Sequence, residues 1–291
     1  MGYQLWTSPL TGYRRKGTTF AALKQIFIDN VTAKCIYEPL LSCPVDSISG
    51  YAKEELKRRD FDVAGVKEVK EGAVVGYVVA EEIGNDDFKT YIKKIGHELL
   101  ISDSTPLAEI FSILSSKYFL FVVYGNNIIG IITKADVNKP PVRIYIFGII
   151  SLLEMHLNSW INHFYPNDTW AVKVPGIRME EANDIYEQRK GNSQELTLLE
   201  CLQLCDKRDL LKNADEFIRL FNFTKTQFVT FIERAEKIRN ELAHSQNSII
   251  SNMEWSEFIE TIATTEKFLI GSDVEVERIA KEGLDFQGLL I

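Results

Sequence analysis

The first half of the chain contains two similar blocks, in each of which a helical hydrophobic period precedes two short β-branched runs. The predicted helices lie at 50–59 and 106–116, and the predicted hairpins at 63–79 and 119–133. Turns rich in Gly, Asn or charged residues between β-branched runs favour β-hairpins. Gly76 and Gly130 hold equivalent places, 54 residues apart, so the pattern predicts an internal repeat. A further helical period at 20–31 precedes the first block.

The second half of the chain has helical periods and no alternating run of useful length. The predicted helical stretches lie at 142–164, 196–211, 214–221, 224–244 and 253–269. Between the first two, the polar stretch at 166–191 predicts a surface loop. Several helices joined by turns indicate a bundle. Pro140 and Pro141 disfavour helix before them and suit a helix start after them, so they mark the joint between the halves.

These patterns predict an α+β protein with two domains, α/β repeats over 1–140 and an all-α bundle over 141–291. A chain of 291 residues is long enough for two domains, each with its own core. Apolar residues at 45% and charged residues at 25% are typical of a soluble globular protein.

The net charge of −8 lies entirely in the second domain. Residues 1–140 hold 17 basic and 17 acidic residues, whereas 141–291 hold 16 and 24. An acidic domain does not bind phosphate backbones broadly, which counts against general nucleic-acid binding. A small local cationic site remains open, and Arg234, Lys237 and Arg239 are the residues that could form it.

Several features favour a cytoplasmic protein that does not bind a membrane. The polar, basic start does not read as a signal peptide. Four cysteines without a C-x-x-C motif favour a reducing compartment. The longest apolar run, at 144–153, is too short to span a bilayer and predicts a buried helix.

The second block ends in Gly130, two isoleucines, Thr133, two further residues and Asp136. This run, with the repeat around it, resembles the ligand motif of a tandem pair of CBS domains, over roughly residues 18–140. The resemblance implies that Thr133 contacts a phosphate and that Asp136 holds both ribose hydroxyls of an adenosine ligand. The chemistry is reasonable, since an ionised carboxylate accepts two hydrogen bonds and helix starts favour anions. The other interpretation is a capping box, in which the same two residues need no ligand.

The first block departs from this motif. Val79 stands where the hydroxyl is expected, and Glu82 stands for the aspartate. The sequence therefore predicts one competent nucleotide site rather than two. AMP, ADP, ATP, S-adenosylmethionine and cyclic dinucleotides all remain candidate ligands. A ligand held by Asp136 could bias the angle of the helix that follows Pro140, although a passive stiff linker would have the same sequence.

Near the end of the period at 224–244 stands Arg239, followed by Asn240 and, five positions after the arginine, by His244. A fixed cation and a group that titrates near neutrality can cleave RNA without metal, with the RNA 2′-hydroxyl as nucleophile. The spacing resembles the R-x4-6-H signature of HEPN-domain ribonucleases. The resemblance implies a HEPN-like helical domain that acts as a metal-independent endoribonuclease, leaves 2′,3′-cyclic phosphates and serves as a toxin or defence effector.

In this resemblance Arg239 steadies the scissile phosphate, His244 is general acid or base, and Asn240 orients His244 or the phosphate. No metal and no catalytic cofactor are implied. Helix geometry sets Arg239 near the centre of an apolar stripe, where a charge needs a partner. That partner is either a carboxylate such as Glu154 or the cleft of a symmetric homodimer. His244 points roughly 140° away from Arg239, so a composite cleft or an early helix end is needed.

The opposing interpretation gives Arg239 an ordinary buried salt bridge and gives His244 the role of complementing a helix dipole. The protein is then a non-catalytic sensor whose helical domain mediates dimerisation or docks a partner, and its acidic charge favours this. A nucleotidyltransferase-type antitoxin is a further possible partner beside the RNA substrate. The remaining histidines, His97, His156 and His163, are interpreted as surface or core residues, with His156 a candidate for the same cleft.

Overall fold

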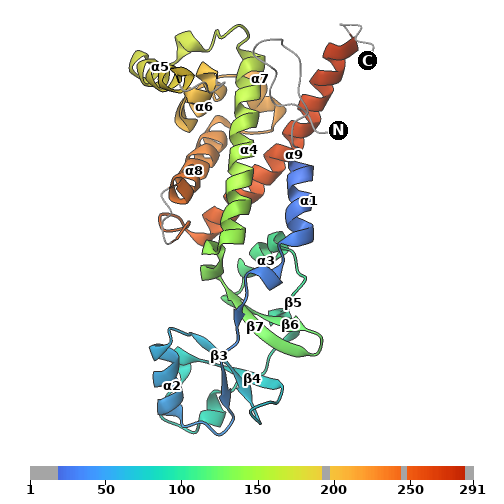
Figure 1. The fold of residues 1–291 in the computed structure, drawn as a ribbon, viewed down its shortest axis with the longest axis vertical. Helices are drawn as coiled ribbons and strands as arrows, with labels where there is room; N and C mark the ends of the chain where they lie inside the picture. Colours follow the sequence, from blue (N-terminus) through green and yellow to red (C-terminus); the bar gives the residue numbers. More distant parts are fainter. Residues whose placement is uncertain (1–18, 192–196, 244–247, 286–291) are drawn as a thin grey trace. The chain divides into compact units, whose positions relative to one another are not determined.

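The computed structural model describes residues 19–191, 197–243 and 248–285 (Figure 1). The chain divides into two compact units. The sheet unit comprises Phe27–Pro141, and the helical unit comprises Val142–Ile291 together with the chain up to Ile26. The division after Pro141 lies one residue beyond the sequence-based limit, and the start of the first helix, α1 (Phe20–Asn30), belongs with the helical unit.

The sheet unit is built from two copies of one succession of elements: strand, helix, strand, strand and 3-10 helix. The first copy consists of β2 (Ser42–Pro44), α2 (Ser49–Arg58), β3 (Val63–Lys67), β4 (Val74–Val79) and η2 (Ala80–Glu82). The second consists of β5 (Leu100–Ser102), α3 (Leu107–Leu114), β6 (Phe119–Tyr124), β7 (Asn127–Thr133) and η5 (Lys134–Asn138). In both copies the first strand is parallel to the second, and the last two form an antiparallel hairpin. The predicted repeat and both hairpins are confirmed.

The chain that precedes the first copy pairs with the second copy. β1 (Glu38–Pro39) is antiparallel to β7, with Glu38 opposite Ile131. Just before it, the backbone N–H of Ala33 donates to the carbonyl of Thr105 at 2.9 Å. The two sheets therefore have the orders β2-β3-β4 and β1-β7-β6-β5, and the second contains a strand from outside its own repeat.

Gly76 and Gly130 lie where another segment pairs closely alongside the last strand of each copy. A Cβ at Gly130 would stand 2.1 Å from Cδ2 of Tyr37 and 2.8 Å from the carbonyl oxygen of Glu38. A Cβ at Gly76 would stand 2.8 Å from the carbonyl oxygen of Lys93. Glycine in a strand often marks such close approach of another backbone. The glycine is thus repeated because the same close pairing of a neighbouring segment is repeated in both copies.

Replacing Gly130 with alanine is expected to lower the free energy of unfolding by about 1–3 kcal/mol, because the added methyl group must displace backbone as well as a ring. Denaturant unfolding of the full chain measures this. Gly50 is the matched control, since a Cβ there meets nothing within 4 Å and the residue is helical. Gly50→Ala is expected to be neutral or to stabilise by up to about 1 kcal/mol. Equal losses of unfolding free energy in both variants would show that close approach of a neighbouring segment does not explain the glycine at position 130.

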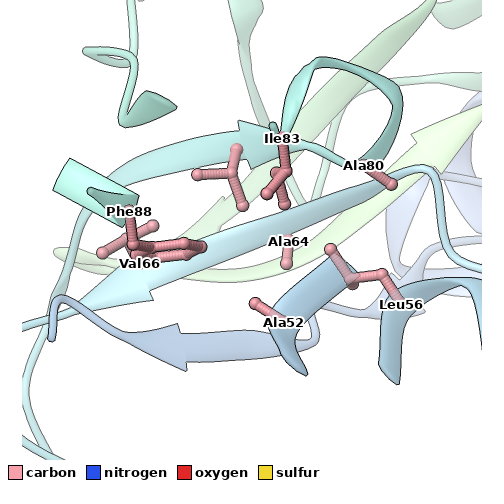
Figure 2. Packing of buried hydrophobic residues seen from close by; sticks show 8 residues of the cluster. Ala52, Leu56, Ala64, Val66, Ala80, Ile83 and Phe88 are labelled. Carbon is pink, nitrogen blue, oxygen red and sulfur yellow. The ribbon is translucent and has the colours of Figure 1, made fainter. Parts of the chain in front are cut away.

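A closed apolar core fills the first copy of the repeat (Figure 2). Figure 2 shows Ala52 and Leu56 of α2 beside Ala64 of β3, so the helix covers one face of the three-stranded sheet. The buried members of the core are Ala52, Leu56, Ala64, Val66, Val78, Ala80, Ile83 and Phe88. Removal of the apolar surface of these side chains from water is the main contribution to the stability of the copy.

A second apolar cluster joins the two copies. Its buried members, Val63, Phe121 and Ile131, come from both sheets. Tyr77 of the first copy stands edge-on to Phe119 and Phe121 of the second, with ring centroids 5.5 and 5.4 Å apart. The two copies therefore share a packed core and do not form two separate domains.

The helical unit is organised around two long helices, α4 (Pro140–Phe164) and α9 (Trp255–Asp285), which run in the same direction (Figure 1). The indole N–H of Trp160 on α4 donates to the hydroxyl of Ser272 on α9 at 2.6 Å. The shorter helices are α5 (Gly176–Gly191), α6 (Leu204–Leu211), α7 (Asp215–Leu220) and α8 (Lys225–Ala243). The described residues from 142 onward contain no strand, so the all-helical prediction is confirmed for them.

The polar stretch at 166–191 was predicted to be a loop, and this is wrong for its second part. Residues 176–191 form α5, a helix of 16 residues. Strong helix formers such as Glu and Arg make the helix, while only Ala182 is buried on it among the described residues, so no apolar stripe marks it. The helix is fixed by polar contacts, which a hydrophobic pattern does not register.

Helix α4 is long and apolar enough to cross a membrane by length and composition. However, 56% of its most apolar window is buried, and a buried central helix of a soluble protein meets the same criteria. Its side chains pack against the other helices of the unit; Trp160 and Tyr145, for example, bond to α9.

Candidate functional sites

Thr133 and Asp136 lie together at the end of β7. The Asp136 carboxylate accepts hydrogen bonds from the backbone N–H of Thr133 at 2.7 Å and from its hydroxyl at 3.2 Å. The Thr133 hydroxyl oxygen in turn accepts from the N–H of Ala135 at 3.3 Å. Asp136 is 6% exposed. These bonds form the capping box that the sequence allowed as an alternative, and the ligand role of Thr133 and Asp136 stays a prediction.

A lysine that the sequence reasoning did not consider also contacts this carboxylate. Lys139 Nζ lies 2.8 Å from Asp136 Oδ1 and 2.5 Å from Glu38 Oε1. It also donates to the carbonyl of Ile36 at 2.5 Å. Burial lowers the pKa of Lys139, but hydrogen bonds to the two carboxylates outweigh this and raise it above its ordinary value. Lys139 is therefore a cation at neutral pH, held between three oxygens.

The equivalent place in the first copy has a different composition. Val79 ends β4 and carries no hydroxyl, as the sequence indicates. Glu82 takes the acidic position and pairs with Lys93 at 2.6 Å, with both side chains more than 40% exposed. In the first copy the acidic position therefore pairs with a lysine at the surface, without a buried acid or a hydroxyl beside it.

Arg239 lies near the end of α8 and is half-buried. Its Nη1 donates to Oδ1 of the exposed Asn240 at 3.3 Å. No carboxylate of the described residues forms an ion pair with its guanidinium. The salt bridge to Glu154 that the sequence suggested for a monomer is absent from this part of the chain. Asn240 is adjacent as predicted, whereas His244 lies outside the described residues.

Glu154 has another partner, the buried Lys207 of α6. Lys207 is 2% exposed, and its Nζ lies 3.4 Å from Glu154 Oε1. Burial lowers the pKa of Lys207, the carboxylates of Glu154 and Glu200 oppose this, and the nearby charge of Arg239 adds to it. The carboxylate of Glu154 is thus paired with Lys207, and the charge of Arg239 acts on Lys207 only as the smallest of these effects.

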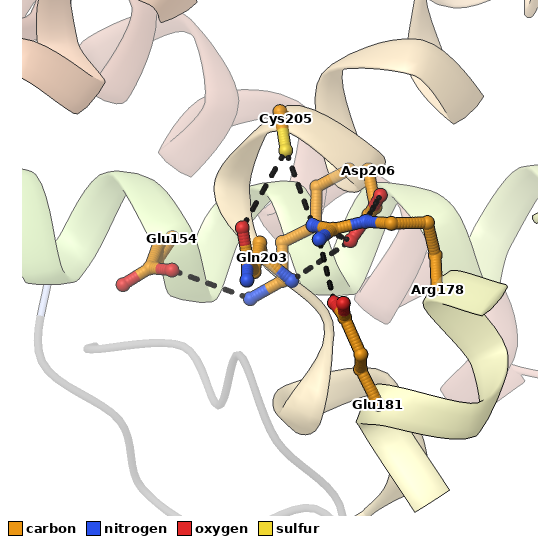
Figure 3. A network of polar contacts seen from close by, with 7 residues as sticks. Glu154, Arg178, Glu181, Gln203, Cys205 and Asp206 are labelled. Carbon is orange, nitrogen blue, oxygen red and sulfur yellow. Dashed lines mark hydrogen bonds and ion pairs between the residues drawn. The ribbon is translucent and has the colours of Figure 1, made fainter.

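Helix α6 is held in place by Arg178 of α5 (Figure 3). The Arg178 guanidinium donates to both oxygens of Asp206, at 3.0 and 2.9 Å, and to Glu181 at 2.7 Å. Bidentate pairs of this kind fix geometry as well as charge. Because Lys207 follows Asp206 directly, the same clamp positions Lys207 against Glu154.

The cationic site suggested by the sequence does not include Arg234. Its guanidinium pairs with Glu257 and Glu260 of α9, each at 2.7 Å, so its charge is neutralised there. Lys237 is exposed on the same helix. The carbonyls of Glu241 and Leu242, at the end of α8, accept from Arg143 Nη2 at 3.4 and 3.5 Å. Arg143 thus complements the helix dipole at the end where His244 follows.

His156 does not face the Arg239 site and is fully buried between α4 and α9. The indole N–H of Trp160 occupies one lone pair of the Ser272 hydroxyl, and Ser272 Oγ lies 2.5 Å from His156 Nδ1. His156 Nε2 lies 3.6 Å from Asp273 Oδ1, beyond hydrogen-bond distance, and has no bonded partner among the described residues. Asp273 Oδ2 accepts the N–H of Phe20 at the start of α1.

The pKa values of His156 and of the partly buried Asp273 are displaced in opposite directions. Burial lowers the pKa of His156 to about 3. Burial also raises the pKa of Asp273 to about 6, opposed by the N–H of Phe20 and assisted by Glu277. At neutral pH the imidazole is therefore neutral and the carboxylate is largely ionised. The cluster is a structural feature of the core, and it has a measurable consequence for stability.

Removing the carboxylate should make folding stability depend more strongly on pH. The lowered pKa of His156 means that stability is lost as pH falls from about 6.5 toward 3. The raised pKa of Asp273 has the opposite sign, adding stability as pH falls from about 6 toward 4, so the two offset each other. In Asp273→Asn only the histidine remains. We expect the variant to lose about 1.4 kcal/mol per pH unit relative to the wild type between pH 6 and 4.

Denaturant unfolding at several pH values measures these slopes. His156→Gln is the converse variant. Its free energy of unfolding relative to that of the wild type should rise as the pH falls from 6 to 4. Slopes of equal sign in the two variants would show that the pair does not titrate in this way.

Within the described ranges, no group of three or more His, Cys, Asp or Glu side chains could hold a metal ion. The chemistry of the candidate sites is that of a carboxylate with a hydroxyl in the sheet unit and of a half-buried guanidinium bonded to an amide in the helical unit.

Comparison with known proteins finds likeness in the sheet unit. No family model matches the chain, and no curated protein matches it. The CBS domains of a transcriptional regulator from Streptococcus pneumoniae match 38% of this chain and 98% of their own, with 20% identity and a TM-score of 0.31. CBSX2 of Arabidopsis thaliana, in complex with AMP, matches 39% and 97%, with 19% identity and a TM-score of 0.33.

A third solved structure is the CBS-domain pair of protein MJ0100 in complex with 5′-methylthioadenosine and S-adenosyl-L-methionine. It matches 37% of this chain and 92% of its own, with 14% identity and a TM-score of 0.33. The similar structures are CBS-domain pairs, and they cover the N-terminal part of the chain. Their TM-scores are below 0.5, so the description of the sheet unit rests on its own strand order and register.

Proposed function

We propose that the sheet unit is a CBS-type sensor that binds one adenosine nucleotide at the end of β7. The observation that carries the proposal is the meeting of a hydroxyl and a nearly buried carboxylate, Thr133 and Asp136, at one end of a repeated unit whose other copy lacks the hydroxyl. A threonine hydroxyl and adjacent backbone N–H groups suit a phosphate, and a carboxylate suits a ribose diol.

Calorimetric titration of the full chain with AMP, ADP, ATP, S-adenosylmethionine and adenosine tests this proposal. We expect one site per chain for at least one of the phosphorylated or sulfonium ligands. Asp136→Asn should weaken that ligand by about tenfold or more, through loss of charge-assisted hydrogen bonds. Glu82→Gln, at the equivalent place in the first copy, is the matched control and should leave affinity unchanged. Binding of none of the five ligands, or equal loss in both variants, would overturn the proposal.

We further propose that the helical unit is a HEPN-like, metal-independent endoribonuclease whose phosphate contact is Arg239. The observation in its favour is that the half-buried guanidinium bonds to the neutral Asn240 amide, with Glu154 occupied by Lys207. A guanidinium so placed is available to a phosphodiester, whereas an internal salt bridge would have removed it. Asn240 and His244 would complete the site, with His244 as general acid or base.

Incubation of the purified full chain with single-stranded RNA in EDTA tests this activity directly. We expect cleavage that leaves 2′,3′-cyclic phosphate ends and that fails on a substrate with 2′-deoxyribose at the cleaved position, because the 2′-hydroxyl is the nucleophile. His244→Ala should lose cleavage as well. Cleavage of the 2′-deoxy substrate, or equal cleavage by the histidine variant and the wild type, would refute the mechanism.

The remaining expectations belong to this proposal. The protein would act in the cytoplasm as a homodimer, with two Arg239 sites forming one cleft, in a toxin or defence role that a nucleotidyltransferase-type antitoxin could restrain. The alternative is a sensor without catalysis, whose acidic helical unit docks a partner. Absence of any RNA cleavage together with intact nucleotide binding would favour that alternative, and sedimentation equilibrium would establish the oligomeric state.

A further inference from the structure

The carboxylate of Asp136 is already occupied in the structure. Its Oδ2 accepts two hydrogen bonds from Thr133, and its Oδ1 pairs with Lys139 at 2.8 Å. Two carboxylate oxygens offer about four acceptor positions. A ribose diol needs two of them, and the Oδ1 positions are the ones not taken by the capping box. Lys139 therefore competes with the diol for the same oxygen atom.

Lys139 is itself held by three oxygens and is only one quarter exposed. Asp136 Oδ1, Glu38 Oε1 and the carbonyl of Ile36 all lie within 2.8 Å of its ammonium group. When a diol takes Asp136, the ammonium loses one carboxylate, and a partly buried cation needs another anion in its place. The phosphate of a nucleotide provides that anion on the ligand itself, and a neutral nucleoside does not.

We propose that Lys139 is a specificity-determining residue of this site, selecting adenosine ligands that carry an anionic group over adenosine itself. This inference rests on the proposed nucleotide site. In the free protein Lys139 occupies Asp136, and in the complex it turns to the ligand phosphate. The ligand class is therefore adenosine mono- or oligophosphates, and the neutral nucleoside is rejected because it displaces the lysine without replacing its partner.

The first copy provides a built-in comparison. Glu82 holds the place of Asp136 in the first copy and pairs with Lys93 at 2.6 Å, although Lys93 comes from the segment bonded to Tyr77 of β4 and not from the position equivalent to Lys139. There the carboxylate is half-exposed and has no threonine beside it, since the equivalent residue is Val79. Loss of Lys93 removes an exposed pair of the same kind without touching the proposed site. Lys93→Met is thus the matched control for Lys139→Met.

Calorimetric titration of the full chain with AMP and with adenosine tests the inference. If Lys139 has this role, its loss should change the affinities for the two ligands in opposite directions. The wild type should bind AMP at least tenfold more tightly than adenosine. Lys139→Met should bind adenosine about tenfold more tightly and AMP about tenfold more weakly than the wild type. Lys93→Met should match the wild type for both ligands. If Lys139→Met folds poorly, Lys139→Gln replaces it in the test, because its amide can still donate to the Ile36 carbonyl. The same changes in affinity for adenosine and AMP are expected of it.

The role of Lys139 and the existence of the nucleotide site are contradicted by different outcomes. Affinities for AMP and adenosine that move in the same direction, or that do not move, would overturn the role of Lys139 and leave the nucleotide site standing. Failure of the wild type to bind AMP, adenosine or any other ligand of the five-ligand titration would refute the nucleotide site, and the role of Lys139 with it. Lys139→Arg retains the charge and should retain the preference for AMP, and its loss in that variant would also count against the inference.

Discussion

Replacing Arg239 with alanine is expected to lower the rate of RNA cleavage by about 10²- to 10³-fold, the usual loss when one donor to a developing negative charge is removed. The guanidinium is half-buried and bonds to the Asn240 amide, so its charge is available to the phosphate rather than to an internal acid. The initial rate of cleavage of a short single-stranded RNA in EDTA measures the effect. Arg239→Lys keeps the charge but loses the planar fork, and should recover only part of the rate.

Arg234 on the same helix is the matched control for Arg239. It is also partly buried, but its guanidinium pairs with Glu257 and Glu260. Arg234→Ala is therefore expected to reduce stability modestly and to leave the cleavage rate per folded molecule unchanged. Equal loss of rate in the two alanine variants would mean that the arginines act through general charge and not through a defined phosphate contact.

Replacing Glu154 with glutamine is expected to lower the free energy of unfolding at pH 7 by about 3–5 kcal/mol, because it leaves Lys207 charged and buried without a partner. Burial already lowers the pKa of Lys207, and loss of the carboxylate lowers it further. A lowered pKa means that stability is lost at pH values below the unfolded pKa and is recovered as pH rises toward it. The deficit should therefore shrink between pH 7 and pH 10.

Guanidinium unfolding at both pH values measures this deficit. The double variant Glu154→Gln with Lys207→Met removes both charges and should restore most of the loss, since a buried pair can be replaced by apolar groups at little cost. Glu233→Gln is the control for an exposed carboxylate. Glu233 is half-exposed where it bonds to Arg208, which also pairs with Asp209, so its loss should cost less than about 1 kcal/mol. A double variant less stable than Glu154→Gln alone would contradict the assigned pairing.

The sequence predicted those parts of the fold that a hydrophobic period marks. Both hairpins and the helices α4 and α8 were expected within a few residues, because each buries one face or stripe. Helix α5 was missed because polar contacts such as the Arg178–Asp206 pair hold it, and these leave no apolar period.

The candidate sites were predictable only in part. Lys207 had a signal, since it stands three residues after Leu204 and four before Leu211 on one helical face, among residues that are all buried. Lys139 had a weaker one, a basic residue three positions after Asp136. Its contact with Glu38 depends on the antiparallel pairing of β1 with β7, between segments about 90 residues apart, which no local pattern specifies.

The way β1 is shared has a consequence for any attempt to divide the sheet unit. The stretch from Val31 to Pro39 comes before the first copy in the chain but is bonded to the second, through Leu107, Thr105 and β7. A fragment that begins after the first copy would lack its donated edge strand and expose the backbone groups of β7 to aggregation. The two repeats are therefore interleaved, and neither is expected to fold faithfully when expressed without the other.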